Sequence, residues 1–281
     1  MEGASFGRQT GIYFKKVARI AMTEKVWKYL VFSVIISFLV AAVVGDNMFE
    51  TKEDTKSGFF ALASACIWIG IFNSIQSICK EHDTIREEYR AGARLSSYVT
   101  ANVLWQMVIS FIQSVIILCV CLIFIDFNDD AIMLSSHIEY FITIFLLVAG
   151  ADIMGIMISS IAGTATTAMT IMPFVLILQL IMSGVLFQLD GWAEIIAYIT
   201  FSKWGMSAFG SIADLNDDRL ELRANIELRD EGLPFEIPYK DQDCYDHEVG
   251  NLLLCWGCCV AVALACYGIS ILCLKIKNRG S

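Results

Sequence analysis

The sequence predicts an all-α integral membrane protein with six transmembrane helices and both termini in the cytoplasm. Of its 281 residues, 57% are hydrophobic and only three are proline. Six apolar runs approach or exceed the roughly 18 residues that indicate a membrane-spanning helix. Lysine and arginine are concentrated in alternate connecting segments, and this asymmetry gives the orientation.

The six predicted spans are 27–45, 58–79, 98–125, 138–160, 167–189 and 251–274. Each is about long enough to cross a hydrocarbon core of roughly 30 Å at 1.5 Å per residue. The stretch SSIAGTATTAMT at 159–170 contains no charge, but a helix running from 138 to 189 would be too long for one crossing. We therefore place a short inner turn there.

The orientation follows from the connecting segments. Segments 1–28, 80–97 and 275–281 carry 13 of the 20 Lys and Arg residues, whereas the alternate segments carry seven. Positive charge favours the cytoplasmic side, so these three segments are predicted to lie inside. We divide the chain into an amphipathic connecting arm at 1–26 and a six-span domain at 27–281, with an inner hairpin at 80–97.

The connecting arm and the last outer segment each have a distinct pattern. In TGIYFKKVARIAMTEK, apolar and basic residues alternate as in an amphipathic helix on the inner membrane surface, its cations near anionic headgroups. A disordered basic tail is the alternative. In the outer segment 190–250, the aromatic-rich first third predicts an interfacial or re-entrant helical hairpin that contains Trp192, Tyr198 and Trp204. The acidic remainder, 216–248, predicts an extracytoplasmic cap.

The chain has no sequence motif of a catalytic site. It lacks the GxxxxGK[ST] loop, the HExxH zinc motif and the nucleophile elbow, so we expect no catalytic residue and no metal site. Seven of ten cysteines fall inside predicted spans and two more, Cys79 and Cys255, lie at span ends, where cysteine is a tolerated small hydrophobe. Cys244 lies outside and is either free, paired with Cys255, or bridged to a second protomer.

Asp152 is the one acidic residue deep inside a predicted span. An intramembrane carboxylate is a candidate for ion coupling. Its neighbours Gly150, Ala151 and Gly155 indicate instead a small-residue surface for close helix contact, and we favour this structural role. The amides within the spans predict interhelical hydrogen bonds. In a second interpretation, Asn73 with Phe72, and Gln179 with Met182, face a central cavity.

The inner hairpin KEHDTIREEYRAGARLSSY predicts a short helix. Thr84 and Glu87 match a capping box, and Gly92 suits the position just past the helix end. Ile85 and Tyr89 form an apolar pair beside a basic stripe of Arg86, Arg90 and Arg94. A helix this short gains stability by docking, so a docking helix for a cytoplasmic partner is favoured over a merely solvated loop.

Three blocks resemble the transmembrane subunits of type-2 ABC exporters, especially the G-subfamily-like branch. They are NSIQSICKEHDTIREEYRAGARLSSYVTANVL (73–104), GADIMGIMISSIAGTATTAMTIMPFVLILQLIMSGVLFQLDG (150–191) and WAEIIAYITFSKWGMSAFG (192–210). The first is similar to that family's coupling helix and its flanking spans. The others are similar to its fifth span with a proline, and to the segment before its last span.

The resemblance implies a permease in a bacterial plasma membrane that works as a homodimer among membrane lipids, with no nucleic acid partner. A substrate cavity between two subunits would include Phe72, Asn73, Gln76, Gln179 and Met182, closed by an apolar plug of Val185 and Leu186. Since the arm has about 26 residues where this branch fuses its ATPase, the ATPase is expected to be a separate chain that holds ATP and magnesium. It would dock through Thr84, Ile85, Arg86, Glu87, Tyr89 and Arg90.

The predicted function is thus non-catalytic export of an amphipathic, lipid, drug or peptide substrate. Two alternatives remain open. One is a proton-coupled secondary carrier that uses Asp152, and the other is a resistance or sensor protein that transports nothing.

Overall fold

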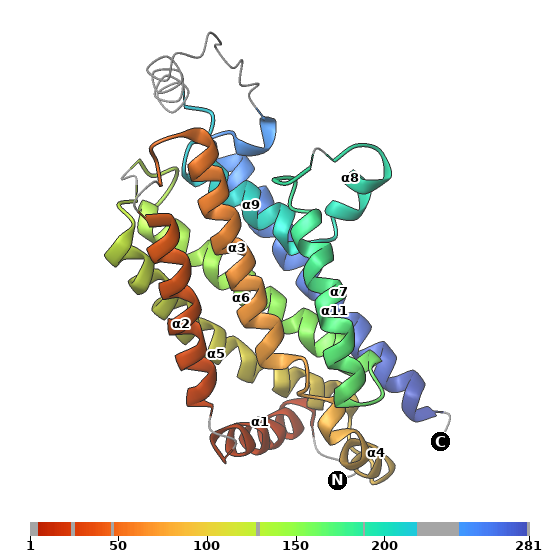
Figure 1. The fold of residues 1–281 in the computed structure, drawn as a ribbon. Coiled ribbons are helices and arrows are strands. Elements are labelled where there is room, and N and C mark those ends of the chain that lie inside the picture. Colours follow the sequence, from red (N-terminus) through yellow and green to blue (C-terminus); the bar gives the residue numbers. More distant parts are fainter. Residues whose placement is uncertain are drawn as a thin grey trace, which may run out of the picture.

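The structure is a computed structural model that describes residues 5–23, 26–45, 48–127, 130–187, 189–217 and 242–279. Every regular element in these ranges is helical, as Figure 1 shows. In chain order they are α1 (Phe6–Thr23), α2 (Trp27–Val44), α3 (Lys52–Ser74), η2 (Cys79–Glu81), α4 (His82–Arg90), α5 (Leu95–Phe124), α6 (Ser136–Ile161), α7 (Ala165–Ile181), α8 (Trp192–Ala197), α9 (Phe201–Ile212), η3 (Asp243–Tyr245) and α11 (Val249–Arg279).

Five stretches of the described chain are long and apolar enough to cross a membrane. They are α2, the α3–α4 stretch, α5, α6 and α11. The predicted fifth span corresponds to α7, which has only 17 residues. At 1.5 Å per residue this helix is about 26 Å long, just short of a typical hydrocarbon core. The all-helical fold is confirmed, and the sixth crossing stays a prediction.

Two predicted span ends are wrong for local reasons. The second span was expected to reach Cys79, but α3 ends at Ser74 and the chain continues through turns into η2. The fifth was expected to reach Leu189, but α7 ends at Ile181. Shortly after it, Gly184 has φ of 76°, a left-handed conformation that glycine adopts without strain and that does not continue an α-helix.

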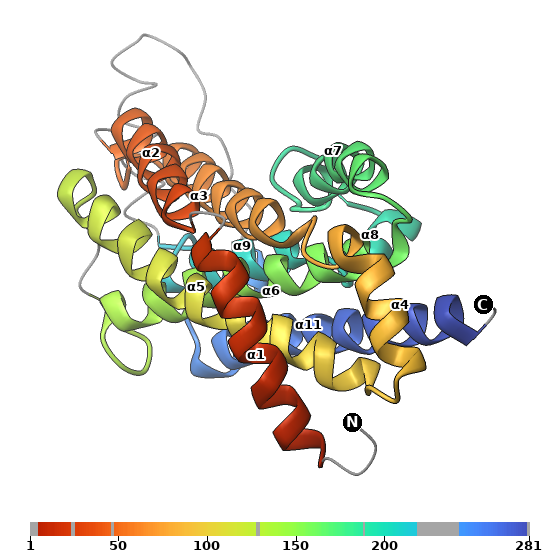
Figure 2. The same ribbon diagram turned by 90° about the horizontal axis from the view of Figure 1, so that it is seen from below.

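The centre of the bundle is α6, which packs against α3, α5, α9 and α11 (Figure 2). Its contact with α3 depends on glycines from both helices. A Cβ atom at Gly70 would overlap the carbonyl oxygen of Val148, and one at Gly155 would overlap the Ser74 hydroxyl. The predicted small-residue surface on α6 is therefore confirmed. Gly150 belongs to a different contact, because its Cβ would meet the ring of Phe201 in α9.

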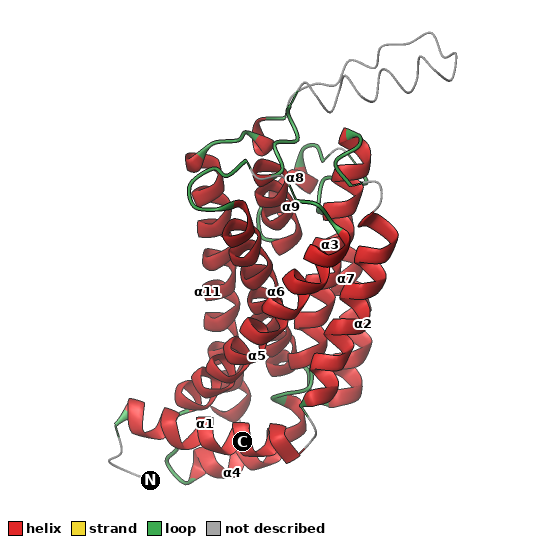
Figure 3. Cartoon of the chain, turned by 90° about the vertical axis from the view of Figure 1, so that its left-hand side faces the viewer, coloured by secondary structure: helices red, strands yellow, loops and turns green. Residues whose placement is uncertain are grey.

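The two ends of the bundle differ in construction. At one end lie α1, α4 and the end of α11, with α1 across the bundle, as Figures 1 and 3 show. At the other end, α8 and α9 form the predicted pair of helices, and the Trp204 indole donates a hydrogen bond to the Tyr198 carbonyl at 2.8 Å. The re-entry of the α8–α9 pair into the membrane stays a prediction. Most of the predicted acidic cap, 218–241, lies outside the described residues.

Candidate functional site

The helix α4 begins earlier than its sequence pattern predicts. It starts at His82 rather than at Thr84, directly after the 3-10 turn η2, and no side chain caps it. The capping box of Thr84 and Glu87 is therefore wrong, since the preceding turn already leads the backbone into the helix. Its end is as predicted. Gly92 has φ of 89°, and its amide bonds the Tyr89 carbonyl at 3.0 Å.

A second hydrogen bond completes this helix end. The Ala93 amide donates to the Glu88 carbonyl at 3.0 Å, so that the two bonds together form a Schellman motif. Leu95 then begins α5 after a short connection. The direction in which α5 leaves α4 is therefore set by backbone hydrogen bonds.

The predicted coupling residues divide between two faces of α4. Thr84, Glu87 and Arg90 are exposed on its outward face together with Asp83. Ile85 is only 2% exposed and packs into the hydrophobic core of the bundle. This inward position means that Ile85 anchors α4 rather than presenting itself to a partner.

Two further residues of the predicted coupling set are partly buried. Tyr89 packs against the same core as Ile85. Arg86 is half-buried, and its Nε atom has no hydrogen-bond partner among the described residues. The predicted basic stripe is thus continuous only from Arg90 to Arg94, which are both exposed. The docking role of the whole set stays a prediction.

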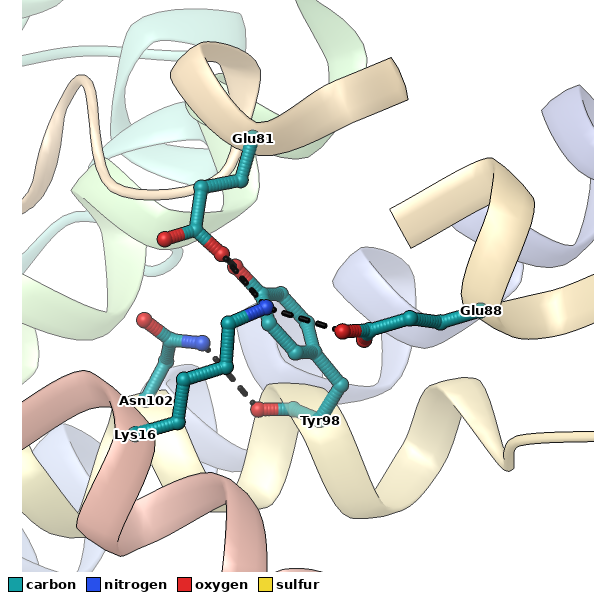
Figure 4. Close-up of polar contacts among 5 residues, drawn as sticks. All are labelled: Lys16, Glu81, Glu88, Tyr98 and Asn102. Carbon is teal, nitrogen blue, oxygen red and sulfur yellow. Dashed lines mark hydrogen bonds and ion pairs between the residues drawn. The ribbon is translucent and has the colours of Figure 1, made fainter. Parts of the chain in front are cut away.

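A charged cluster joins α4 to α1 and α5 (Figure 4). Lys16 Nζ lies 3.0 Å from Glu88 Oε1 and 3.5 Å from Glu81 Oε2. The Tyr98 hydroxyl donates to the same Glu81 oxygen at 3.0 Å. We call Lys16, Glu81, Glu88 and Tyr98 the Lys16 cluster. It connects α1 to a later part of the chain that runs from η2 through α4 into α5, with Glu88 lying 72 residues after Lys16.

The pKa values of Lys16 and of the neighbouring Tyr13 are both raised, so both groups stay protonated at neutral pH. Burial raises the pKa of the neighbouring Tyr13 to about 12, helped by the charge and hydrogen bond of Glu88. Burial acts to lower the pKa of Lys16, but the hydrogen bond and charge of Glu88 and the charge of Glu81 outweigh it, so this pKa is raised. Lys16 therefore stays charged and paired at neutral pH.

Sequence reasoning missed this cluster. The connecting arm does form a helix, α1, and Lys16 pairs with Glu88 of α4, a contact that the sequence pattern did not predict; the headgroup contacts of the arm stay a prediction. Lys15 and Arg19 remain exposed. Part of the cluster could have been found from the sequence, since Glu81 and Glu88 are seven residues apart and a helical inner hairpin would place them on one side.

A second polar cluster lies inside the bundle. Asn73 Nδ2 of α3 donates to Gln113 Oε1 of α5 at 2.7 Å, and Gln113 Nε2 donates to Ser33 Oγ of α2 at 2.8 Å. Gln106 Nε2 donates to the Asn73 carbonyl at 3.4 Å. We call these four residues the amide network. The predicted interhelical role of the span amides is confirmed for this set.

Asp152 adjoins the amide network. Its carboxyl is fully buried and accepts a hydrogen bond from the Ser110 hydroxyl of α5, with Asn73 and Ser74 close by. These contacts join α6 to α3 and α5. They support the structural role that its small neighbours predicted, and ion coupling stays untested.

A cavity of about 190 Å³ lies between α1 and the adjoining ends of α2, α3 and α5. It brings together three of the five predicted cavity residues, Phe72, Asn73 and Gln76. Gln179 is elsewhere and buried, with its side-chain oxygen accepting from the Ser202 amide at 3.1 Å. Met182 is also buried and does not line this cavity. Within one subunit the predicted cavity set is therefore divided.

The remaining predicted site residues lie toward the other end of the bundle. Val185 packs partly against the core, whereas Leu186 is exposed, and a plug role for either stays a prediction. Cys244 and Cys255 are both free thiols, so the structure contains no bridge between them. A bridge from Cys244 to a second protomer stays a prediction.

The family model described as ABC-2 type transporter matches residues 16–213. This range runs from within α1 to the end of α9 and covers more than half of the chain. A comparison with curated proteins gives no match. Together with the five long apolar helices, the family match makes the protein a multi-pass membrane protein with a role in transport. The chain belongs to the ABC-2 type transporter family, whose members are membrane permeases.

Proposed function

We propose that the chain is the non-catalytic permease subunit of a bacterial ATP-driven exporter of the G-subfamily-like branch. Two copies would form a path for an amphipathic, lipid, drug or peptide substrate. A separate ATPase chain, holding ATP and magnesium, would dock on α4 and drive the two copies between inward-open and outward-open states. Both termini and α4 would be cytoplasmic.

The observation that carries this proposal is the construction of α4. Its outward face presents opposite charges, from Asp83 and Glu87 to Arg90, at the end of a long apolar bundle. Its inward face is fixed by the buried Ile85, and its C-terminus is fixed by the Schellman motif at Gly92. A short helix with a polar, exposed outward face that is anchored by Ile85 and by the Schellman motif suits the transfer of motion from a partner.

The size of the cavity supports a second permease copy. Pockets that enclose a drug-sized ligand usually measure about 300–1,000 Å³. The cavity of about 190 Å³ within one subunit is smaller than this range. Phe72 at its edge is 36% exposed, so a facing subunit could extend the space beside it. This fits a substrate path shared between two copies.

The proton-coupled alternative has less support. Asp152 is fully buried, accepts a hydrogen bond from Ser110, and lines neither the cavity beneath α1 nor the smaller cavity beside Gln179. A carrier would need this carboxyl to meet both substrate and water. The third candidate, a sensor that transports nothing, would depend on the acidic cap, which is mostly outside the described residues.

The test reverses charge on the outward face of α4. The Glu87→Lys, Arg90→Glu double variant should insert normally but should lose most of the vanadate-sensitive ATP hydrolysis that co-purifies with the tagged chain from its own membranes. The matched control is Lys275→Glu, an exposed residue of α11 at the same end of the bundle. Unchanged hydrolysis in the double variant would refute docking on α4. Transport that survives ATP depletion but not Asp152→Asn would favour the carrier instead.

A further inference from the structure

The cavity beneath α1 has features that the proposed export path does not require. It lies inside a single subunit, and its walls come from α1, α2, α3, the turn after α3, η2 and α5, with one residue of α7. Its apolar lining includes Val17, Ile20 and Ala21 of α1 and Trp105 and Ile109 of α5. Its polar lining comprises Asn73, Gln76, Ser77, Lys80, Glu81, Asn102 and Gln106. The pocket is therefore amphipathic.

The polar groups differ in how far they are already satisfied. Glu81 is paired with Lys16 and Tyr98, and the Gln106 amide nitrogen bonds the Asn73 carbonyl. By contrast, Lys80 is exposed and has no ion pair within the described chain, and the Gln76 side chain makes no hydrogen bond there, although the Gln76 carbonyl accepts from the Lys80 amide at 3.4 Å. A ligand entering here thus meets an uncommitted cation and an uncommitted amide.

The volume limits what can enter. An apolar cavity of about 150 Å³ binds benzene, and drug-sized ligands need about 300 Å³ or more. A cavity of about 190 Å³ therefore takes a short segment of one hydrocarbon chain rather than a bulky molecule or a pair of chains. The lining of α1 and α5 offers that segment an apolar surface beside the ring of Trp105.

We propose that this cavity binds a single-chain anionic amphipath from the inner leaflet, of the fatty-acid class. The carboxylate lies at Lys80 and Gln76, and the first part of the chain lies between α1 and α5. The proposal rests on the proposed function only for placing the α1–α4 end at the cytoplasmic surface. A diacyl lipid is too large, and a cationic amphipath would face Lys80 without a free carboxylate, since Glu81 is already paired.

The position of the site gives it a direct connection to α4. Glu81 lines the cavity and also belongs to the Lys16 cluster, immediately before α4 begins. A bound chain would contact α1 through Val17, Ile20 and Ala21, on the same helix as Lys16. Occupancy would therefore act on the joint between α1 and α4 from within one subunit.

The test uses the fluorescence of Trp105. The purified full chain in phosphatidylcholine nanodiscs is titrated with brominated stearate, whose bromines quench nearby indoles. Binding in the cavity predicts a saturable quenching component that Trp105→Phe removes. Ala21→Leu, which fills the cavity from α1, should weaken that component without replacing the tryptophan.

The charge is tested separately. Lys80→Glu should weaken stearate binding about three- to tenfold, as expected when a partly exposed ion pair becomes a repulsion. The control Lys275→Glu should leave stearate binding unchanged. Binding of brominated stearyl alcohol, which carries no charge, should be the same with and without Lys80→Glu.

Two outcomes would overturn the inference. If quenching rises linearly with stearate concentration and is unchanged in Trp105→Phe, the stearate only partitions into the bilayer. Saturable quenching that ignores Lys80→Glu would exclude the anionic class. Neither readout involves the ATPase, so failure here would leave docking on α4 intact, and failure of docking would leave this binding intact.

Discussion

The amide network and the Lys16 cluster both join helices that are distant in the sequence, but they do so in different surroundings. Gln113 is 0% exposed and Asn73 is 9% exposed. The charged side chains of the Lys16 cluster are 22–29% exposed. The first cluster is therefore buried inside the bundle, whereas the charged groups of the second meet water at the bundle end.

This difference in burial implies different mechanical roles. A buried amide that loses its partner in an apolar interior leaves a polar group unsatisfied, which is costly. A partly exposed ion pair contributes little, because water can replace either partner. We infer that the centre of the bundle is fixed and that the joint between α1 and α4 can rearrange.

The largest effect should come from the α3–α6 contact beside the amide network. Gly70→Ala places a methyl group against the Val148 carbonyl, and because this atom is backbone the helices must separate. Overpacking of this kind costs about 1–3 kcal/mol or more. Thermal unfolding in detergent should show the loss. Gly257→Ala in α11, where a Cβ meets open space, should be neutral, and equal effects would contradict the close contact.

An intermediate effect is expected inside the amide network. Gln113→Leu removes the partner of Asn73 and Ser33 and should lower the free energy of unfolding by about 1–2 kcal/mol, the range for hydrogen-bonding side chains between membrane helices. The Asn73→Leu, Gln113→Leu double variant should lose less free energy of unfolding than the sum of the two single variants. In each single variant the remaining amide is left unpaired, whereas in the double variant both are gone. Simple additivity in chemical unfolding would show that the two amides do not cooperate.

The smallest effect on stability, below about 1 kcal/mol, should come from Lys16→Met. Its visible consequence should be local, because α1 loses its bond to α4 and trypsin should cut more readily after the exposed Arg19. Lys15→Met is the matched control, since Lys15 is exposed on the same helix. If Lys16→Met destabilised the bundle more than Gln113→Leu, the contrast between fixed centre and mobile joint would be wrong.

Local patterns predicted the parts of the structure that depend on neighbours in sequence. Gly92 was identified from its place after a short amphipathic run, and the small residues beside Asp152 predicted a close helix contact. Hydropathy located the long helices. The predicted cap at Thr84 was wrong because a backbone turn, rather than a side chain, begins α4. The predicted end of α7 was wrong because the apolar run in the sequence continues past Gly184, where the helix has already ended.

Contacts between distant segments could not be predicted in the same way. The arm was expected only to place its cations near lipid headgroups, and the pairing of Lys16 with Glu88 becomes visible only once α1 is placed across the bundle. Likewise the hydrogen bond from the Ser202 amide to the Gln179 side-chain oxygen could not be predicted, because Ser202 comes from a segment after the span, and Gln179 still lines a small cavity there. Periodicity identifies which residues share a face, but it does not identify what that face meets.

The Schellman motif at Gly92 has a consequence for the amplitude of movement. Because α4 passes into the 30-residue α5 through a short hydrogen-bonded corner, α5 and the helices that the amide network joins to it would tilt together, as one lever with its pivot at that corner. At 1.5 Å per residue the lever is about 45 Å long, so a tilt of about 10° at the pivot displaces its far end by about 8 Å. A small push at one surface would thus be magnified into a large displacement at the other.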